Sequence, residues 1–104
     1  MALRVRVCAL DEIAECELQS FEVPGVAIPI LVTMVNGEII AGTSMCPHED
    51  VSLVRGRIRG NTIVCSAHGY QFDLHSGQCA HDPTLRWRLY KPTVQSGQLY
   101  VDLA

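Results

Sequence analysis

The stretch that decides the fold of this chain is residues 46–68, CPHEDVSLVRGRIRGNTIVCSAH. It begins with Cys46-Pro47-His48 and ends with Cys65-Ser66-Ala67-His68, so each end pairs one cysteine with one histidine. Thiolates and imidazoles are the side chains that bind iron, zinc and copper in proteins. Pro47 fixes the backbone between the two residues of the first pair and stiffens that loop. Two like half-sites of this kind suit a binuclear centre with one sulfur-ligated metal and one nitrogen-ligated metal.

The spacing Cys-x-His…Cys-x-x-His resembles that of the Rieske family, in which two histidines replace two cysteines on one iron of a [2Fe–2S] cluster. This resemblance implies one such cluster, with Cys46 and Cys65 on one iron and His48 and His68 on the other. It also implies an all-β fold, a small antiparallel sandwich or barrel of Rieske type with the cluster-binding loops at one end.

The rest of the chain is similar to the soluble Rieske ferredoxins of bacterial multicomponent oxygenases. An expected first strand is followed by the acidic stretch Asp11-Glu12-Ile13, as in that group. The closing region shares a pattern carried here by Gly77, Pro83, Leu85, Tyr90 and Pro92. The resemblance implies that the loop around Asp82-Pro83 covers the cluster.

Short strands separated by turn residues are predicted along the whole chain. Asn36-Gly37 between two apolar runs predicts a hairpin, because both turn positions need positive φ. Gly60-Asn61 and Ser96-Gly97 are further predicted turns. The expected strands are residues 3–8, 18–23, 28–35, 38–41, 56–59, 62–65, 70–74, 85–90 and 99–101. Residues 11–17 are expected to form a turn or at most one helical turn. This pattern by itself predicts a small antiparallel sandwich or barrel.

Composition limits the class of protein further. The length of 104 residues predicts one domain, 1–104, and 48% apolar residues permit a buried core. A net charge of −3 argues against a nucleic-acid or anionic-membrane binder and fits a partner with a basic patch. No signal peptide or membrane span is expected. Five cysteines are an odd number, which favours a reduced, cytoplasmic protein. Cys8, Cys16 and Cys79 are expected to be small buried or half-buried side chains.

Other residues have simpler interpretations. His75 and His81 are expected on surface loops, and Trp87 in the core. Docking of a partner is an open hypothesis for two sets of exposed charges. The basic set is Arg55, Arg57, Arg59, Arg86 and Arg88, and the acidic set is Glu49 and Asp50.

The function that the resemblance implies is one-electron transfer without catalysis. A single electron would pass from a flavoprotein NAD(P)H reductase to a terminal oxygenase acting on aromatic or related hydrocarbons. Both partners would dock transiently on a monomer. The sequence has no Gly-rich dinucleotide motif and no room for a mononuclear iron domain. Two alternatives stay open: a Rieske small subunit of nitrite reductase or another redox enzyme, and a zinc-stabilised binding module without redox chemistry.

The reduction potential is expected at the low end of the Rieske range. The high-potential members of the family carry an extra cysteine in each ligand loop, which forms a disulfide, and a serine and a tyrosine after the second ligand pair. This chain has neither cysteine and carries Phe72 where the tyrosine hydroxyl would be. Glu49 and Asp50 add negative charge near His48, which disfavours reduction.

Overall fold

The computed structural model describes residues 3–48 and 50–103, and these residues form two antiparallel sheets. The larger sheet has the strand order β1-β9-β8-β4-β3-β2, and the smaller has the order β5-β6-β7. The strands are β1 (Arg4–Ala9), β2 (Gln19–Phe21), β3 (Ile30–Val35), β4 (Glu38–Thr43), β5 (Arg57–Arg59), β6 (Thr62–Val64), β7 (Gln71–Asp73), β8 (Leu89–Gln95) and β9 (Gln98–Asp102). Two short 3₁₀ turns, η1 (Leu10–Glu12) and η2 (Leu53–Arg55), complete the described elements. The prediction of an all-β antiparallel fold is confirmed.

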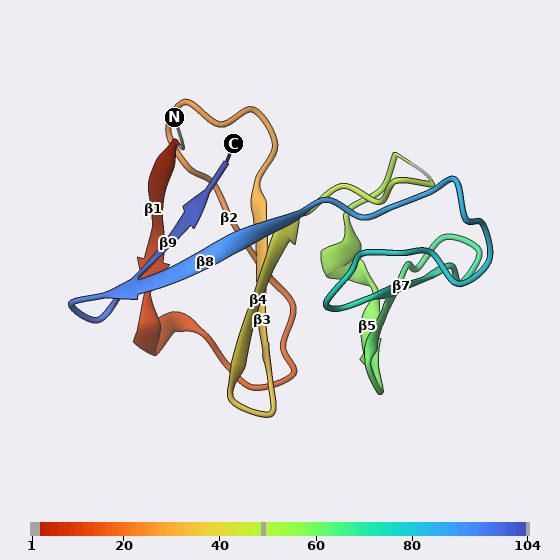
Figure 1. Cartoon of the computed structure of the whole chain (residues 1–104), viewed down its shortest axis with the longest axis horizontal. Coiled ribbons are helices and arrows are strands. Elements are labelled where there is room, and N and C mark those ends of the chain that lie inside the picture. Colours follow the sequence, from red (N-terminus) through yellow and green to blue (C-terminus); the bar gives the residue numbers. More distant parts are fainter. Residues whose placement is uncertain (1–2, 49, 104) are drawn as a thin grey trace.

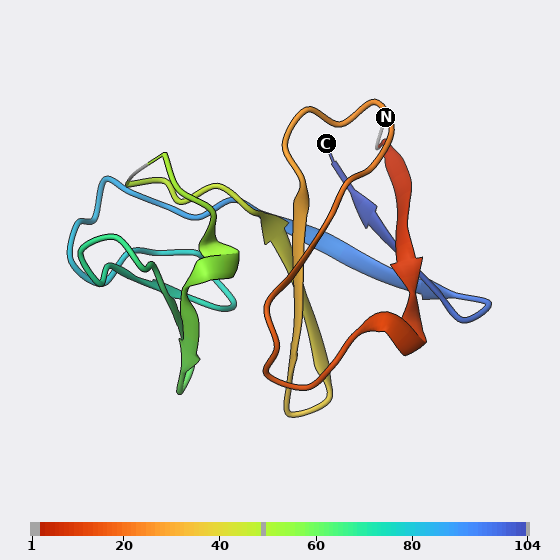
Figure 2. The ribbon, with the colours of Figure 1, turned by 180° about the vertical axis from the view of Figure 1, so that it is seen from behind.

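The two sheets lie at opposite ends of the molecule. Figure 1 shows the larger sheet curled on one side, with β5 and β7 and a group of loops on the other. The chain enters the second region after β4 and returns from it into β8, which Figure 2 shows from behind. We call the six-stranded sheet the base and residues 44–88 the small lobe. The small lobe therefore contains both predicted ligand motifs.

Turn residues place the hairpins of the base where the sequence predicts them. Asn36 and Gly37 have φ of 54° and 78° between β3 and β4. Ser96 and Gly97 have φ of 53° and 75° between β8 and β9. These paired positive values give the backbone twist that matches two adjoining strands, so the loops are two residues long.

Strand β3 is buried on both of its faces. Ile30 and Val32 pack in the core of the base, whereas Leu31 packs in the core that extends into the small lobe. All three side chains are fully buried. A strand covered on both sides has no polar face, which explains why this part of the sequence is a continuous apolar run instead of an alternating one.

The expected strand over residues 85–90 is wrong in its position. Strand β8 begins at Leu89, and Arg86 makes only an isolated bridge to Gln78. The alternation of apolar and charged residues around Trp87 has a different cause. Trp87 is fully buried, and its amide donates to the carbonyl of Gly77 at 2.7 Å. The segment 85–88 lies outside the named strands, and the buried Trp87 stands between the exposed Arg86 and Arg88.

Trp87 joins the small lobe to the base. Its indole Nε1 donates to the carbonyl of Thr43 at 2.7 Å, and the amide of Thr43 donates to the carbonyl of Arg88 at 3.0 Å. Gly42 lies directly under the indole, since an added Cβ would stand 2.6 Å from Trp87 Cζ2. The core position predicted for Trp87 is confirmed, and the entry and exit strands of the small lobe meet at this side chain.

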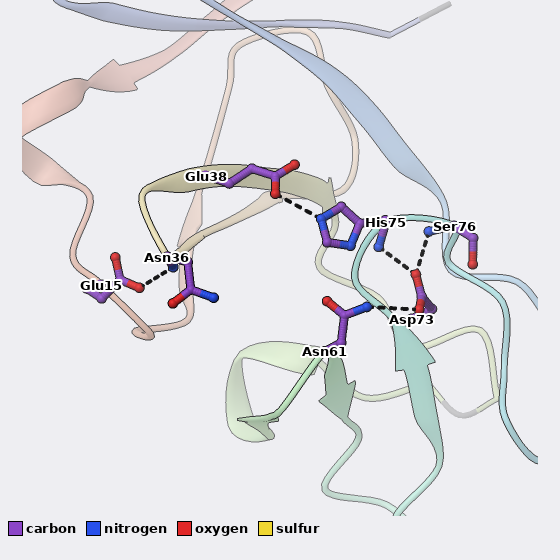
Figure 3. Close-up of polar contacts among 7 residues, drawn as sticks. All are labelled: Glu15, Asn36, Glu38, Asn61, Asp73, His75 and Ser76. Atoms are coloured by element: carbon purple, nitrogen blue, oxygen red, sulfur yellow. Dashed lines mark hydrogen bonds and ion pairs between the residues drawn. The ribbon is translucent and has the colours of Figure 1, made fainter.

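Polar contacts form a second connection between the two regions. The carboxylate of Asp73, at the end of β7, accepts from the amides of His75 and Ser76 at 2.8 Å each. Asn61 Nδ2 donates to the same carboxylate at 3.3 Å. The His75 ring then reaches Glu38 at the start of β4 (Figure 3).

Within residues 3–48 and 50–103 there is no helix of the length and apolarity that a membrane crossing requires.

Candidate metal centre

The first ligand loop is a narrow backbone hairpin built on the end of β4. Leu53 donates its amide to the carbonyl of Ser44 at 2.6 Å, and Met45 bridges to Ser52. Closer to the tip of the loop than these two contacts, the amide of Cys46 donates to the carbonyl of Val51 at 2.9 Å. Cys46 therefore sits at the closed base of the loop, and the chain beyond it turns outward through Pro47.

The second ligand loop links β6 to β7. The amide of Cys65 donates to the carbonyl of Tyr70 at 2.8 Å and closes the loop. His68 and Gly69 follow each other with φ of 63° and 69°. A left-handed conformation is uncommon for a residue with a side chain, and here two in a row reverse the chain direction. The reversal places His68 on the outside of the loop, while Cys65 stays at its base.

The four predicted ligands differ sharply in exposure. Cys46 is 3% exposed and Cys65 is 1% exposed, and both belong to the core of the small lobe. His48 is half-buried and His68 is exposed. The sulfur ligands are thus on the protein side and the imidazoles on the solvent side.

Both histidine rings belong to a line of aromatic rings. The centroids of His48 and His68 are 5.2 Å apart, with the rings nearly perpendicular at 84°. Tyr70 stacks on His48 with centroids 3.7 Å apart and an interplanar angle of 21°. His81 lies on Tyr70 at 5.4 Å. The structure therefore brings together the two histidines that the resemblance assigns to one iron.

One buried nitrogen without a hydrogen-bond partner indicates that these residues suit a metal. Nδ1 of His48 is buried and has no hydrogen-bond partner. A buried polar atom without a partner costs free energy, so it needs a compensating interaction. A neutral imidazole nitrogen with a free lone pair is the donor that iron binds. The side chains therefore fit a cluster that meets His48 at Nδ1.

The four residues do not surround one point. Among residues 3–48 and 50–103, no group of three or more histidine, cysteine or acidic side chains is close enough to hold a single ion. A Rieske cluster has two protein ligands on each iron, so pairs are the arrangement that it requires. The pairing of the two rings across two loops matches this requirement.

A third loop borders the site, as the resemblance implies. The amide of Cys79 donates to the carbonyl of Leu85 at 3.2 Å and closes this loop. Within it, Asp82 accepts from the hydroxyl of Thr84 at 2.6 Å and from its amide at 2.9 Å. These hydrogen bonds hold the pKa of Asp82 below its ordinary value. Asp82 therefore stays ionised beside a predicted ligand.

Two aromatic neighbours of the site were not identified from the sequence as functional. Tyr70 lies two residues after His68 of the second ligand pair, and the sequence places His81 only on a surface loop. His81 is indeed exposed, but it contacts Tyr70. The position of this tyrosine, close to His68 in the sequence, could have indicated that it lies beside the site. Nothing in the sequence places His81 beside it.

The remaining predicted residues have simple positions. Cys8 and Cys79 are buried as expected, whereas Cys16 is exposed at φ 58° in a turn, so its expected burial is wrong. The five arginines considered for docking are all exposed. Asp50 is exposed, and Glu49 lies outside the described residues.

Comparison with known proteins agrees with this site. The model of the Rieske [2Fe-2S] domain family matches residues 4–95. The ferredoxin component of the p-cumate 2,3-dioxygenase system of Pseudomonas putida is 36% identical, over 95% of this chain and 85% of that protein. The ferredoxin component of the alkene monooxygenase system of Xanthobacter autotrophicus is 29% identical, over 93% and 79%.

A solved complex of reduced oxygenase and oxidised ferredoxin in carbazole 1,9a-dioxygenase also contains a similar chain. That chain is 27% identical with a TM-score of 0.83, over 95% of this chain and 92% of the other. A family model that spans most of the chain assigns the iron–sulfur cluster and excludes the alternative of a zinc module. This protein therefore belongs to the Rieske [2Fe–2S] domain family.

Proposed function

We propose that this protein is the ferredoxin component of an oxygenase system and carries one electron at a time. The observation that carries the proposal is the likeness to oxygenase ferredoxins along nearly the whole of both chains. Those relatives are electron-transfer components and not the catalysts of their systems. The same role for this chain makes it a carrier without catalysis of its own.

In this proposal Cys46 and Cys65 hold one iron, and His48 and His68 hold the other. The cluster, when bound, supplies a centre that is reduced by one electron at a higher potential than an all-cysteine cluster. The chain's own part is positional. The two closed loop bases hold the sulfur ligands in the core, where they are 3% and 1% exposed. The loop tips hold the imidazoles at the surface.

The exposed imidazole end is the docking face in this proposal. Asp50, Asp82 and His81 border it, and the arginines of η2 and β5 lie on the flank of the same lobe. A terminal oxygenase and a flavoprotein NAD(P)H reductase would each bind this end transiently. We further propose one domain over residues 1–104, a monomeric state and a cytoplasmic location.

The ligand assignment is tested by spectroscopy on purified protein. The wild type should be coloured, should contain iron and acid-labile sulfide in equal amounts, and should give the rhombic EPR spectrum of a Rieske cluster after reduction. Replacement of His48→Ala or His68→Cys should abolish that spectrum. His75→Ala is the matched control, because His75 is an exposed histidine of the same lobe that contacts Glu38 and not the ligand loops. A His48→Ala protein with the wild-type spectrum would refute the assignment.

The carrier role is tested by a reconstituted chain of electron transfer. Reduced wild-type protein, mixed with the oxidised terminal oxygenase of the p-cumate system, should be reoxidised in a single-turnover stopped-flow experiment. The same protein should be reduced by NADH only when the flavoprotein reductase of that system is present. A stable stoichiometric complex with one large redox enzyme, and no exchange between partners, would instead identify a fixed subunit.

A further inference from the structure

Tyr70 holds together two loops that carry predicted ligands. Its carbonyl accepts the amide of Cys65 at 2.8 Å, which closes the second ligand loop. Its ring stacks face to face on His48, with centroids 3.7 Å apart. His48 belongs to the first ligand loop, so one residue fixes the base of one loop and the tip of the other.

A third loop also reaches the Tyr70 ring. His81 lies on the tyrosine ring at 5.4 Å with an interplanar angle of 42°. The amide of His81 donates to the sulfur of Cys79 at 3.4 Å, which ties this ring to a buried residue of the lobe core. Both views of the chain show the three loops together at the end of the small lobe that faces away from the base (Figures 1 and 2). Tyr70 therefore contacts imidazoles from two other loops.

Orientation of the His48 ring decides where its donor nitrogen points. The imidazole rotates about its bond to Cβ, and rotation would carry the buried, unpartnered Nδ1 away from its present direction. A stacked ring at 3.7 Å blocks that rotation on one face. It also keeps water from that face. The contact uses the ring of tyrosine and not its hydroxyl.

We propose that Tyr70 is a positioning residue, whose ring fixes the imidazole of His48 in the orientation that presents Nδ1 to iron, with His81 of the third loop supporting the tyrosine ring. This inference rests on the ligand role of His48 in the proposed function. It predicts that the electronic structure and retention of the cluster depend on an aromatic ring at residue 70 and not on a hydroxyl.

The test compares Tyr70→Phe with Tyr70→Leu in the cluster-loaded protein. Tyr70→Phe should match the wild type in EPR line shape, midpoint potential and rate of cluster loss to a chelator. Tyr70→Leu should broaden and shift the EPR spectrum and change the potential. Its cluster should be lost about 2- to 12-fold faster, the factor that corresponds to the free energy of one aromatic pair. Tyr90→Leu is the matched control, because Tyr90 is a half-buried tyrosine of the base.

His81→Leu provides an independent variant at an exposed position. It should shift the EPR spectrum in the same direction as Tyr70→Leu and by less. If Tyr70→Leu fails to fold, an unchanged spectrum in His81→Leu overturns the inference. A Tyr70→Leu protein with the wild-type spectrum and potential also overturns it, as does Tyr70→Phe behaving like Tyr70→Leu. A wild type without a Rieske spectrum would instead refute the proposed function.

Discussion

Nε2 of His75 lies 2.9 Å from Oε1 of Glu38, and the two residues belong to different regions of the molecule. Glu38 begins β4 of the base, and His75 follows β7 of the small lobe (Figure 3). The hydrogen bond and charge of Glu38 raise the pKa of His75 above 6.5, its ordinary value. The charged form of His75 is therefore favoured in the folded protein.

The first prediction concerns the pH dependence of this contact. A histidine whose pKa is raised by folding stabilises the folded state fully below the unfolded pKa. The stabilisation is lost as pH rises through the folded pKa. His75→Gln should therefore lower the melting temperature at about pH 5.5, and the difference should shrink toward about pH 8.5. Melting curves followed by circular dichroism across this range measure it.

The control for that prediction is a double-mutant cycle. Glu38→Gln removes the main partner, so His75→Gln should have a much smaller pH-dependent effect in the Glu38→Gln background, where only the charge of Asp73 still raises the pKa of His75. A pH-dependent loss of undiminished size without Glu38 would contradict the assignment to this pair.

The second prediction compares two glycines with nearly the same backbone conformation. Gly77 and Gly97 have φ of 77° and 75°. A Cβ at Gly77 would fall well inside contact distance of the carbonyl oxygen of Trp87, whereas at Gly97 it would meet open space. Gly97→Ala should cost about 1–2 kcal/mol of left-handed strain. Gly77→Ala should cost about 1–3 kcal/mol more, because it also overpacks the junction at Trp87.

Urea unfolding at matched cluster content measures both values. Equal losses in the two variants would show that the carbonyl of Trp87 moves aside to admit the Cβ, which would contradict this prediction.

The third prediction concerns the reactivity of two cysteines outside the ligand set. Burial raises the pKa of Cys8 to about 11, and the charge of Glu12 adds to this effect. At about pH 8 only about one Cys8 in a thousand would be the reactive thiolate. Cys16 is exposed. Brief treatment of the folded protein with iodoacetamide should therefore label Cys16 and spare Cys8.

Peptide mass spectrometry gives the site of labelling. Treatment in urea is the control, in which both cysteines should be labelled. Labelling of Cys8 in the folded protein at the rate of Cys16 would show that β1 opens far more often than its burial indicates.

The fourth prediction is the reduction potential. Rieske centres span roughly −150 to +300 mV. Phe72, fully buried beside the site, offers no hydroxyl, and Ala67 replaces the cysteine of high-potential members of the family. We expect a midpoint potential in the negative part of this range, measured by protein-film voltammetry. A value well above zero would show that another group near the cluster stabilises the reduced state.

Local patterns predicted much of this fold, because turns and ligand spacing are local. Asn36-Gly37 and Ser96-Gly97 adopt the positive φ values that the hairpins require. The alternation around Trp87 misled the strand assignment, since a residue buried at a junction gives the same pattern as one in a half-buried strand.

Contacts between distant segments were not predictable in the same way. Tyr70 and His81 belong to separate loops, and only the closed loop bases bring Tyr70 to His48 and His81 to Tyr70. The contact between His75 and Glu38 likewise depends on how the small lobe is set on the base. No periodicity or motif encodes these pairings. Cys16 is exposed in a turn, where its own backbone is left-handed. Sequence preference would place glycine or asparagine in that conformation, so the turn at Cys16 was not predictable.

Burial of Cys46 and Cys65 and exposure of His68 have a kinetic consequence for a carrier. In the proposed function, electron donor and electron acceptor would dock on the same small patch of surface, so the two would not be bound at once. Turnover then requires complete dissociation between loading and delivery. An excess of either partner would slow the cycle by competing for the shared patch. A permanent complex of the three proteins would not transfer electrons from donor to acceptor.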